Sequence, residues 1–408
     1  MKEHDKNEKG KELTSKLSPE QFKSPDRRFR PLTWYRVGIP DAKVIREELI
    51  RLKKYGLGGI CIIPESHLSP WLKSGYLSEE FWETIRLIVE EAVKQDMRIW
   101  LYDELDFPSG VAGGQVLKNH PEYGVTGLAY QEITVGGGKR LEIPLPEGEP
   151  VAVLAEKTSR PGVFEDLKAE ISGGALLWDA PPGKWKIHFF TKQVIHNLVD
   201  QLEEYSERRP YVNIMDANAI REFISLTYEG YMRTVGRHFG KAIEAIFTDE
   251  PALHLAGFWN VPPPSEPRPP MLPWVDGFPE YFFARKGYEI EPKLPYLVKD
   301  LGPETSKIRC DYWEVVSDLI AGSYFVQLQQ WCMRHGIAFT GHLLLEESLM
   351  LHLMFTGSLI RCLSKMDIPG IDVIGPRPDR SLLTQTMTGW GGPWVPKFAS
   401  SAAHTRGK

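Results

Sequence analysis

Acidic side chains follow directly after several apolar runs that are typical of buried strands. One run ends in Asp103 and Glu104 and another in Asp249 and Glu250, and a single acid at a strand end is unremarkable. Helix N-caps or an ion-pair network could explain about half of such acids. Acids after four strands in succession are harder to explain in that way. The full set is Glu65, Asp103, Glu104, Asp249, Glu250, Glu346 and Glu347, with Asp372 inside the last predicted strand.

Hydrolysis of a glycosidic bond is a reaction that uses such a set. One carboxylic acid protonates the leaving oxygen, while a second carboxylate acts as a nucleophile or activates water. Further polar groups and aromatic rings then bind the sugar hydroxyls and ring faces. We expect Trp34, His67 and His342 to contribute there, although each alone is more often structural than a ligand contact. The acids expected to bind substrate with them are Glu65, Asp103, Glu104, Asp249 and Asp372.

Other chemistries have weaker support in the sequence. The first strand lacks the His-x-His of a metal amidohydrolase, and the late strand ends lack the Lys of a Schiff-base aldolase. GLGG and VGGGK lack the strand–turn–helix context of a phosphate-binding loop, and there is no G-x-S-x-G nucleophile elbow. The net charge of −5 provides no basic face for nucleic acid. The residues themselves indicate no cofactor and no metal site.

An alternation of apolar runs and amphipathic helices positions these acids. The run LTWYRVGI precedes a helix predicted over 41–56, with Asp41 as its N-cap and Gly56 just past its end. A second helix is predicted over 78–96. The strands are apolar throughout, which indicates burial on both faces and therefore a parallel sheet of βα units.

Six such strands are expected, at about 33–39, 60–64, 98–102, 244–248, 337–341 and 371–374. A (β/α)₈ barrel needs eight strands. The architecture is therefore either an open α/β sheet or a TIM-type barrel that is incomplete, and we favour the barrel. In a barrel the reactive groups lie at the carboxyl ends of the strands, where these acids fall.

The rhythm is interrupted by a region of β runs and turns. We divide the chain into a disordered segment (1–25), a first barrel part (26–123), an inserted β-sandwich-like domain (124–195) and a second barrel part (196–408). Within the insertion, APPGKW between two apolar runs predicts a hairpin. The insertion either braces the larger domain, which we favour, or is a binding module.

Composition places the chain among globular proteins. It has 408 residues, an apolar fraction of 42% and 12 Trp. The N-terminal stretch is charged without an apolar h-region, and no apolar run is long enough for a membrane span. The four Cys are scattered, which predicts reduced, mostly buried thiols in a cytoplasmic protein. The oligomeric state is left open.

Several stretches together resemble a known family. They are FRPLTWYRVGIPDAKVIREELIRLKKYGLGGICIIPE, YDELDFPSGVAGGQVLKNHPEY, AIFTDEPAL, LPWVDGFPEYFFARKGYEI, TGHLLLEESL and MDIPGIDVIG. From about Phe29 onward the chain is similar to the barrel of bacterial glycosyl hydrolases akin to glycoside hydrolase family 106, the α-L-rhamnosidases. The resemblance implies a (β/α)₈ barrel with appended β domains that acts on plant or microbial glycans, inversion at α-L-rhamnosides, and use of calcium.

The resemblance also implies roles for single residues. Glu250 in FTDEP corresponds to the strand-four acid, which we expect to be the general acid, and Glu346 or Glu347 corresponds to a second carboxylate. YDELDFPSG matches a signature of the group. In that group the stretch K-x-ASSAAH-x-xGK is normally followed by a strand with another Glu, whereas this sequence stops at Lys408. We therefore expect a truncated glycoside hydrolase, with a non-catalytic carbohydrate-binding remnant as the alternative.

Overall fold

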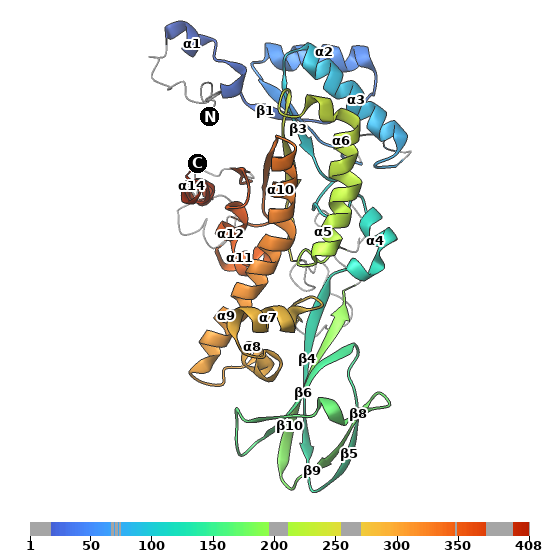
Figure 1. Cartoon of the computed structure of the whole chain (residues 1–408), viewed down its shortest axis with the longest axis vertical. Coiled ribbons are helices and arrows are strands. Elements are labelled where there is room, and N and C mark those ends of the chain that lie inside the picture. The colour runs from blue at the N-terminus through green and yellow to red at the C-terminus, as the bar shows by residue number, and fades with distance from the viewer. Residues whose placement is uncertain are drawn as a thin grey trace, which may run out of the picture.

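The computed structural model describes residues 18–66, 69, 72, 75–195, 211–253, 271–346, 349–372 and 395–407. The molecule is elongated. An α/β part occupies one end of the long axis and a β part the other, with helices α7, α8 and α9 next to the β part (Figure 1).

Six strands form one parallel sheet in the order β1-β2-β3-β11-β13-β14. They are β1 (Leu32–Tyr35), β2 (Gly59–Ile62), β3 (Arg98–Tyr102), β11 (Ile243–Asp249), β13 (Ala338–His342) and β14 (Ile368–Pro369). Within the described ranges β1 and β14 are the edges and do not pair, so these strands do not close a barrel. A mixed α/β fold with a parallel sheet is confirmed, whereas a TIM-type barrel stays a prediction.

The sixth strand was predicted in the wrong place. It was expected at about 371–374, but β14 comprises only Ile368 and Pro369. The N–H of Gly370 donates to the carbonyl of Gly341, where pairing with β13 ends. A Cβ on Gly370 would lie 2.4 Å from that carbonyl oxygen, so only glycine fits this close approach. Residues 373 and 374 lie outside the described residues.

The two long helices predicted early in the chain are confirmed. Helix α2 (Ala42–Lys54) is N-capped by Asp41, and helix α3 (Glu79–Lys94) by Ser78. Gly56 adopts the left-handed conformation just after α2. The other helices are α1 (Pro19–Lys23), α4 (Gln115–Asn119), α5 (Ala217–Phe223), α6 (Glu229–Val235), α7 (Phe278–Lys286), α8 (Leu294–Val298), α9 (Glu304–Ile320), α10 (Gln327–Arg334), α11 (Leu349–Thr356), α12 (Leu359–Leu363) and α14 (Val395–Thr405).

The two faces of the parallel sheet have different environments. Alternate residues such as Ile62 and Leu101 belong to the large apolar core shared with the helices. The other face, which we call the inner face, carries aromatic side chains. On it the ring of Trp34 lies 5.6 Å from that of Phe247. Strands β2 and β3 separate these two residues in the sheet, so the sheet must curl around the inner face.

The inserted β region consists of two sheets. Their strands are β4 (Thr126–Gly136), β5 (Lys139–Pro144), β6 (Glu149–Lys157), β7 (Phe164–Asp166), β8 (Ile171–Ser172), β9 (Ala175–Ala180) and β10 (Lys184–Val194). The orders are β12-β4-β10-β6-β7 and β5-β9-β8. Strand β12 (Met271–Trp274) enters the first sheet from the second α/β part of the chain and fastens the insertion to it.

The hairpin predicted at APPGKW is wrong. The turn joins β9 to β10, but β9 pairs with β5 and β8, whereas β10 pairs with β4 and β6. Trp178 and Trp185 flank the turn and pack edge to face with ring centroids 5.1 Å apart in a core that both sheets share. Burial of both indoles therefore favours a corner between two sheets over direct pairing.

Three smaller features complete the fold. Helix α1 lies in the part of segment 1–25 that the structure describes. Cys61, Cys332 and Cys362 are buried free thiols, and Cys310 is an exposed one. Among the described helices, none combines the length and the apolar character needed to cross a bilayer.

Candidate active site

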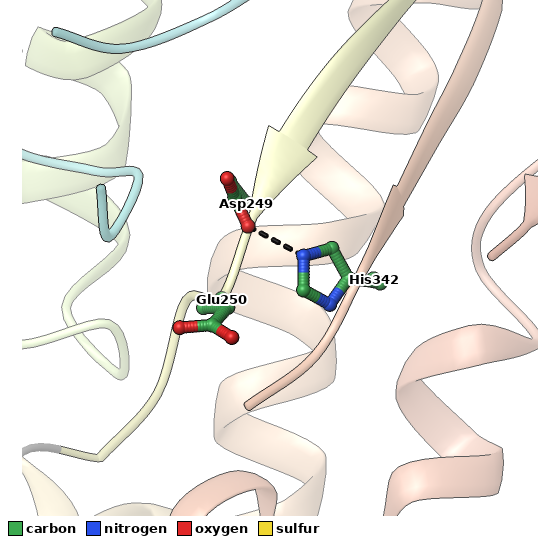
Figure 2. A group of neighbouring side chains, drawn as sticks. All are labelled: Asp249, Glu250 and His342. Atoms are coloured by element: carbon green, nitrogen blue, oxygen red, sulfur yellow. Dashed lines mark ion pairs between the residues drawn. The ribbon is translucent and has the colours of Figure 1, made fainter. Parts of the chain in front are cut away.

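Four of the predicted site residues meet at the carboxyl ends of β11 and β13. Asp249 is the last residue of β11 and His342 the last of β13, and Glu250 follows Asp249 (Figure 2). His342 Nε2 lies 2.5 Å from Asp249 Oδ1, and His342 Nδ1 lies 3.3 Å from Glu346 Oε1. The imidazole is therefore held between two carboxylates.

Local sequence explains why β11 and β13 bring these side chains together. Along β11, Phe247 and Asp249 face inward, while the hydroxyl of Thr248 lies on the opposite face, 2.7 Å from Tyr324 Oη. Gly341 precedes His342 with φ of +151°, and a Cβ there would lie 2.1 Å from the carbonyl oxygen of Thr248. The glycine therefore lets β13 approach β11 closely at the level of the site.

His342 is the cationic group of this cluster. Burial alone would lower the pKa of its imidazole, but the carboxylates of Asp249 and Glu346 raise the pKa well above the ordinary value of 6.5. Only 5% of the residue is exposed. A charged imidazolium is therefore expected at neutral pH, with Nε2 paired to Asp249 and Nδ1 within ion-pair distance of Glu346 but without hydrogen-bond geometry.

Glu250 has the properties of a proton donor. Burial raises the pKa of its carboxyl to about 8, Asp249, Glu346 and Asp372 contribute to the increase, and His342 opposes it. Within the described residues this carboxyl accepts no hydrogen bond. Glu250 also has φ of +48°, a left-handed conformation that costs an L-residue on the order of 1 kcal/mol and that often occurs at functional sites.

Glu346 lies in the segment that follows β13. Its Oε1 accepts a hydrogen bond of 2.5 Å from the N–H of Asp372, and its carbonyl oxygen lies 2.6 Å from His352 Nε2. Asp372 thus reaches the site through its backbone. Glu347, the predicted alternative to Glu346, and His67, a predicted sugar-binding residue, lie outside the described residues.

The same cluster offers metal-ligand atoms, because oxygens of Asp249 and Glu250 and a nitrogen of His342 lie within 4.8 Å of one another. Calcium, which the family resemblance implied, takes six to eight oxygen ligands. Here the imidazole nitrogens are directed at Asp249 and Glu346 instead. The donor set does not fit calcium, and no step below uses a metal.

Tyr102 is a site residue that the sequence reasoning missed. Its hydroxyl donates to Asp249 Oδ2 at 2.5 Å and also lies 2.8 Å from the carbonyl oxygen of Asp106. The ring stacks on Phe247 with centroids 6.0 Å apart. Strand alternation could have indicated Tyr102, because it precedes Asp103 and therefore points to the opposite face.

Asp103 points away from the inner face. Its carboxylate accepts hydrogen bonds from Ser109 Oγ (2.6 Å) and Tyr228 Oη (2.8 Å), and no part of the residue is exposed. Burial raises its pKa to about 8, against the effect of these two donors. In this structure Asp103 does not reach a ligand bound on the inner face.

Glu104 organises the loop after β3. Its carboxylate accepts from five backbone N–H groups, four of them consecutive, at distances of 2.5–3.0 Å, and it is fully buried. Burial raises its pKa to about 7, whereas the N–H donors favour the charged form. The donors are Leu105, Gly110, Val111, Ala112 and Gly113.

Two further predicted residues flank the inner face. Trp34 is 42% exposed there and is the kind of flat aromatic surface on which a sugar ring can stack. Glu65 forms an ion pair of 2.7 Å with Arg36, whose guanidinium lies over the Trp34 ring. A separate cavity of about 440 Å³ lies between α3 and α6, beside Trp82 and Arg233, and contains none of the predicted site residues.

Comparison with known proteins gives distant relatives. No family model matches the chain. A Formosa agariphila protein named "Putative beta-glucuronidase" is 21% identical over 370 residues, which cover 78% of this chain and 30% of that protein. The solved rhamnosidase from Novosphingobium sp. PP1Y has a TM-score of 0.59 and 15% identity, over 85% of this chain and 48% of that one.

The two relatives bear on the fold of this chain and on the class of reaction to test. The structural likeness shows that the chain shares its fold with the rhamnosidase. Both relatives carry the names of enzymes that act on glycosyl bonds. The chain spans less than half the length of each of these two proteins.

Proposed function

We propose that this chain carries the catalytic centre of a glycoside hydrolase that cleaves O-glycosidic bonds. Glu250 is the general acid and Glu346 the second carboxylate. The observation that carries the proposal is the carboxyl of Glu250, whose raised pKa of about 8 keeps it protonated at neutral pH beside the Glu346–His342–Asp249 cluster. The names of both relatives support the same class of reaction.

The geometry suits the charge changes of this reaction. Glu250 transfers its proton to the leaving oxygen and becomes a carboxylate, which the nearby imidazolium of His342 stabilises. Glu346, oriented by the N–H of Asp372, either activates a water molecule or attacks the anomeric carbon. Trp34 offers its exposed ring to the sugar. The substrates to test first are α-L-rhamnosides and β-D-glucuronides.

A non-catalytic carbohydrate-binding protein is the second candidate. It is favoured by the engagement of Glu346 Oε1 with both Asp372 and His342, which leaves this oxygen little capacity for a water molecule. This candidate predicts sugar binding in calorimetry without turnover of any glycoside.

The decisive experiment compares Glu250→Gln with Glu244→Gln on aryl glycosides. Glu244 lies on the same strand and pairs with Arg98, away from the site, so it controls for loss of a carboxylate from β11. We expect Glu250→Gln to reduce kcat by about 10²- to 10⁴-fold while sugar binding is retained. Wild-type activity should fall above about pH 8, where Glu250 loses its proton.

Each outcome has a clear meaning. Unchanged turnover in Glu250→Gln would remove this residue from the mechanism. An equal loss in Glu244→Gln would show that the effect is structural. Binding without turnover in the wild type would favour the second candidate.

A further inference from the structure

Ser109, in the loop after β3, uses its polar atoms to connect three parts of the site. Its N–H donates to the carbonyl oxygen of Asp249 at 2.7 Å, and its Oγ accepts from the N–H of Asp249 at 2.8 Å. The same Oγ donates to Asp103 Oδ1 at 2.6 Å, and its carbonyl oxygen accepts from the hydroxyl of Tyr211. The residue is fully buried.

The two contacts with Asp249 fix the backbone on both sides of that residue. One holds the N–H that belongs to the peptide from Thr248, and the other holds the carbonyl of the peptide that leads to Glu250. The peptide group that joins Asp249 to Glu250 therefore has a fixed orientation, and Glu250 adopts φ of +48°. The direction of its carboxyl depends on that backbone conformation, because Glu250 has no hydrogen bond of its own among the described residues.

The residues around Ser109 hold it in place in turn. Asp103 lies behind its hydroxyl, and Tyr228 donates to the other oxygen of Asp103. The next two residues of the loop, Gly110 and Val111, donate their N–H groups to Glu104 Oε2. Asp103 and Glu104, the buried acids after β3, thus hold the loop in place by hydrogen bonds. The loop in turn holds the end of β11 through Ser109.

We propose that Ser109 is a positioning residue: by clamping both backbone groups of Asp249, it holds Glu250 in the left-handed conformation that presents its carboxyl to the substrate. This inference rests on the proposed role of Glu250 as the general acid. It gives the paired acids of DELDFPSGVAGG an indirect function, because they hold Ser109 and do not contact the substrate.

The test uses three full-chain variants. Ser109→Ala removes the contacts of Oγ but leaves the N–H bond to Asp249, and Ser109→Thr keeps the hydroxyl. Ser317→Ala is the matched control: Ser317 is also a buried serine, its Oγ donates to the carbonyl of Trp313 at 2.6 Å within α9, and it does not contact the site.

We expect Ser109→Ala to speed exchange of the Asp249 amide hydrogen and to move Glu250 out of the left-handed region in a crystal structure. On a glycoside that the wild type hydrolyses, kcat should fall about 10- to 100-fold, while KM stays within about twofold of the wild-type value. The reason is that the reacting group is displaced while binding is unchanged. Ser109→Thr should retain the wild-type amide exchange, Glu250 conformation and kcat, and Ser317→Ala should change none of these three properties.

The proposal is overturned if Glu250 keeps φ near +48° and the Asp249 amide stays protected in Ser109→Ala. It is also overturned if Ser317→Ala lowers kcat equally. The structural and exchange measurements decide the matter even if the chain has no turnover. If Ser109→Ala displaces Glu250 but Glu250→Gln does not affect turnover, the clamp is real and the proposed function is wrong.

Discussion

Strands β3 and β11 lie side by side, and an Asp-Glu dipeptide stands at the carboxyl end of each, directly after β3 and across the end of β11. The two acid pairs nevertheless have different environments. Asp103 and Glu104 are fully buried and satisfied by hydroxyl and backbone donors. Asp249 instead pairs with His342 on the inner face, and Glu250 accepts no hydrogen bond within the described residues.

The Asp-Glu pair after β3 lies one residue out of register with the Asp-Glu pair at the end of β11. Tyr102 is level with Phe247, so Asp103 comes level with Thr248, which faces away from the site. Asp249 lies one residue further along β11 and faces inward. Because successive residues of a strand point to opposite faces, this single step moves an acid pair from the core into the site.

The chain after each pair reinforces the difference. The loop after Glu104 contains residues with positive φ, among them Asp106, Gly110 and Ala112, and it turns its N–H groups toward the carboxylate. Glu250 is followed by Pro251, which has no N–H to donate. The same dipeptide therefore organises a loop at one strand and stays available for chemistry at the other.

The largest effect expected from this comparison is on stability. Glu104→Gln places an amide NH₂ among backbone donors and removes the charge that they solvate, so we expect the free energy of unfolding to fall by about 3–5 kcal/mol. Glu250→Gln, which loses no hydrogen bond to a described residue, should leave it unchanged within about 0.5 kcal/mol at pH 5. Urea unfolding of both variants measures the contrast, and equal losses would contradict it.

A second effect concerns the pH dependence of stability. The pKa of Glu250 rises from 4.5 to about 8 on folding, so the native state holds this proton more tightly than the unfolded chain. The stability it contributes is therefore present at low pH and is lost as pH rises through this range. Asp103, with a pKa near 8, and Glu104, near 7, act in the same direction.

Removing one of these groups should change the slope of the free energy of unfolding against pH. Between pH 5 and pH 8, the free energy of unfolding of the wild type should fall by about 3 kcal/mol more than that of Glu250→Gln. Urea unfolding at several pH values provides the measurement. Parallel curves for the two proteins would show that Glu250 does not hold its proton in the native state.

The sequence was sufficient for the features that depend on local pattern. The all-apolar runs predicted the parallel sheet, and the N-cap Asp41 predicted the start of α2. The meeting of Asp249, Glu250, His342 and Glu346 was also anticipated, because parallel strands end at one edge of the sheet.

The sequence was not sufficient for features that depend on register and on contacts between distant segments. Whether Asp103 or Tyr102 faces inward depends on how β3 pairs with β11, and a one-residue slip reverses the answer. The role of Ser109 depends on a contact 140 positions away in the chain, with Asp249. The corner at APPGKW likewise depends on which sheet each flanking Trp helps to cover.

The smallest effect compares one hydroxyl on each face of the sheet. Tyr228→Phe removes the donor to Asp103 Oδ2, and Tyr102→Phe removes the donor to Asp249 Oδ2 while keeping its ring on Phe247. Each should lower the free energy of unfolding by about 1 kcal/mol, as for a single hydrogen bond to a buried carboxylate. Only Tyr102→Phe should also shift the ¹⁵N resonances of the His342 imidazole and lower kcat, because Asp249 holds that imidazole at the site. Equal shifts of the His342 resonances in both variants would mean that the two strand ends are coupled more tightly than their separate hydrogen bonds indicate.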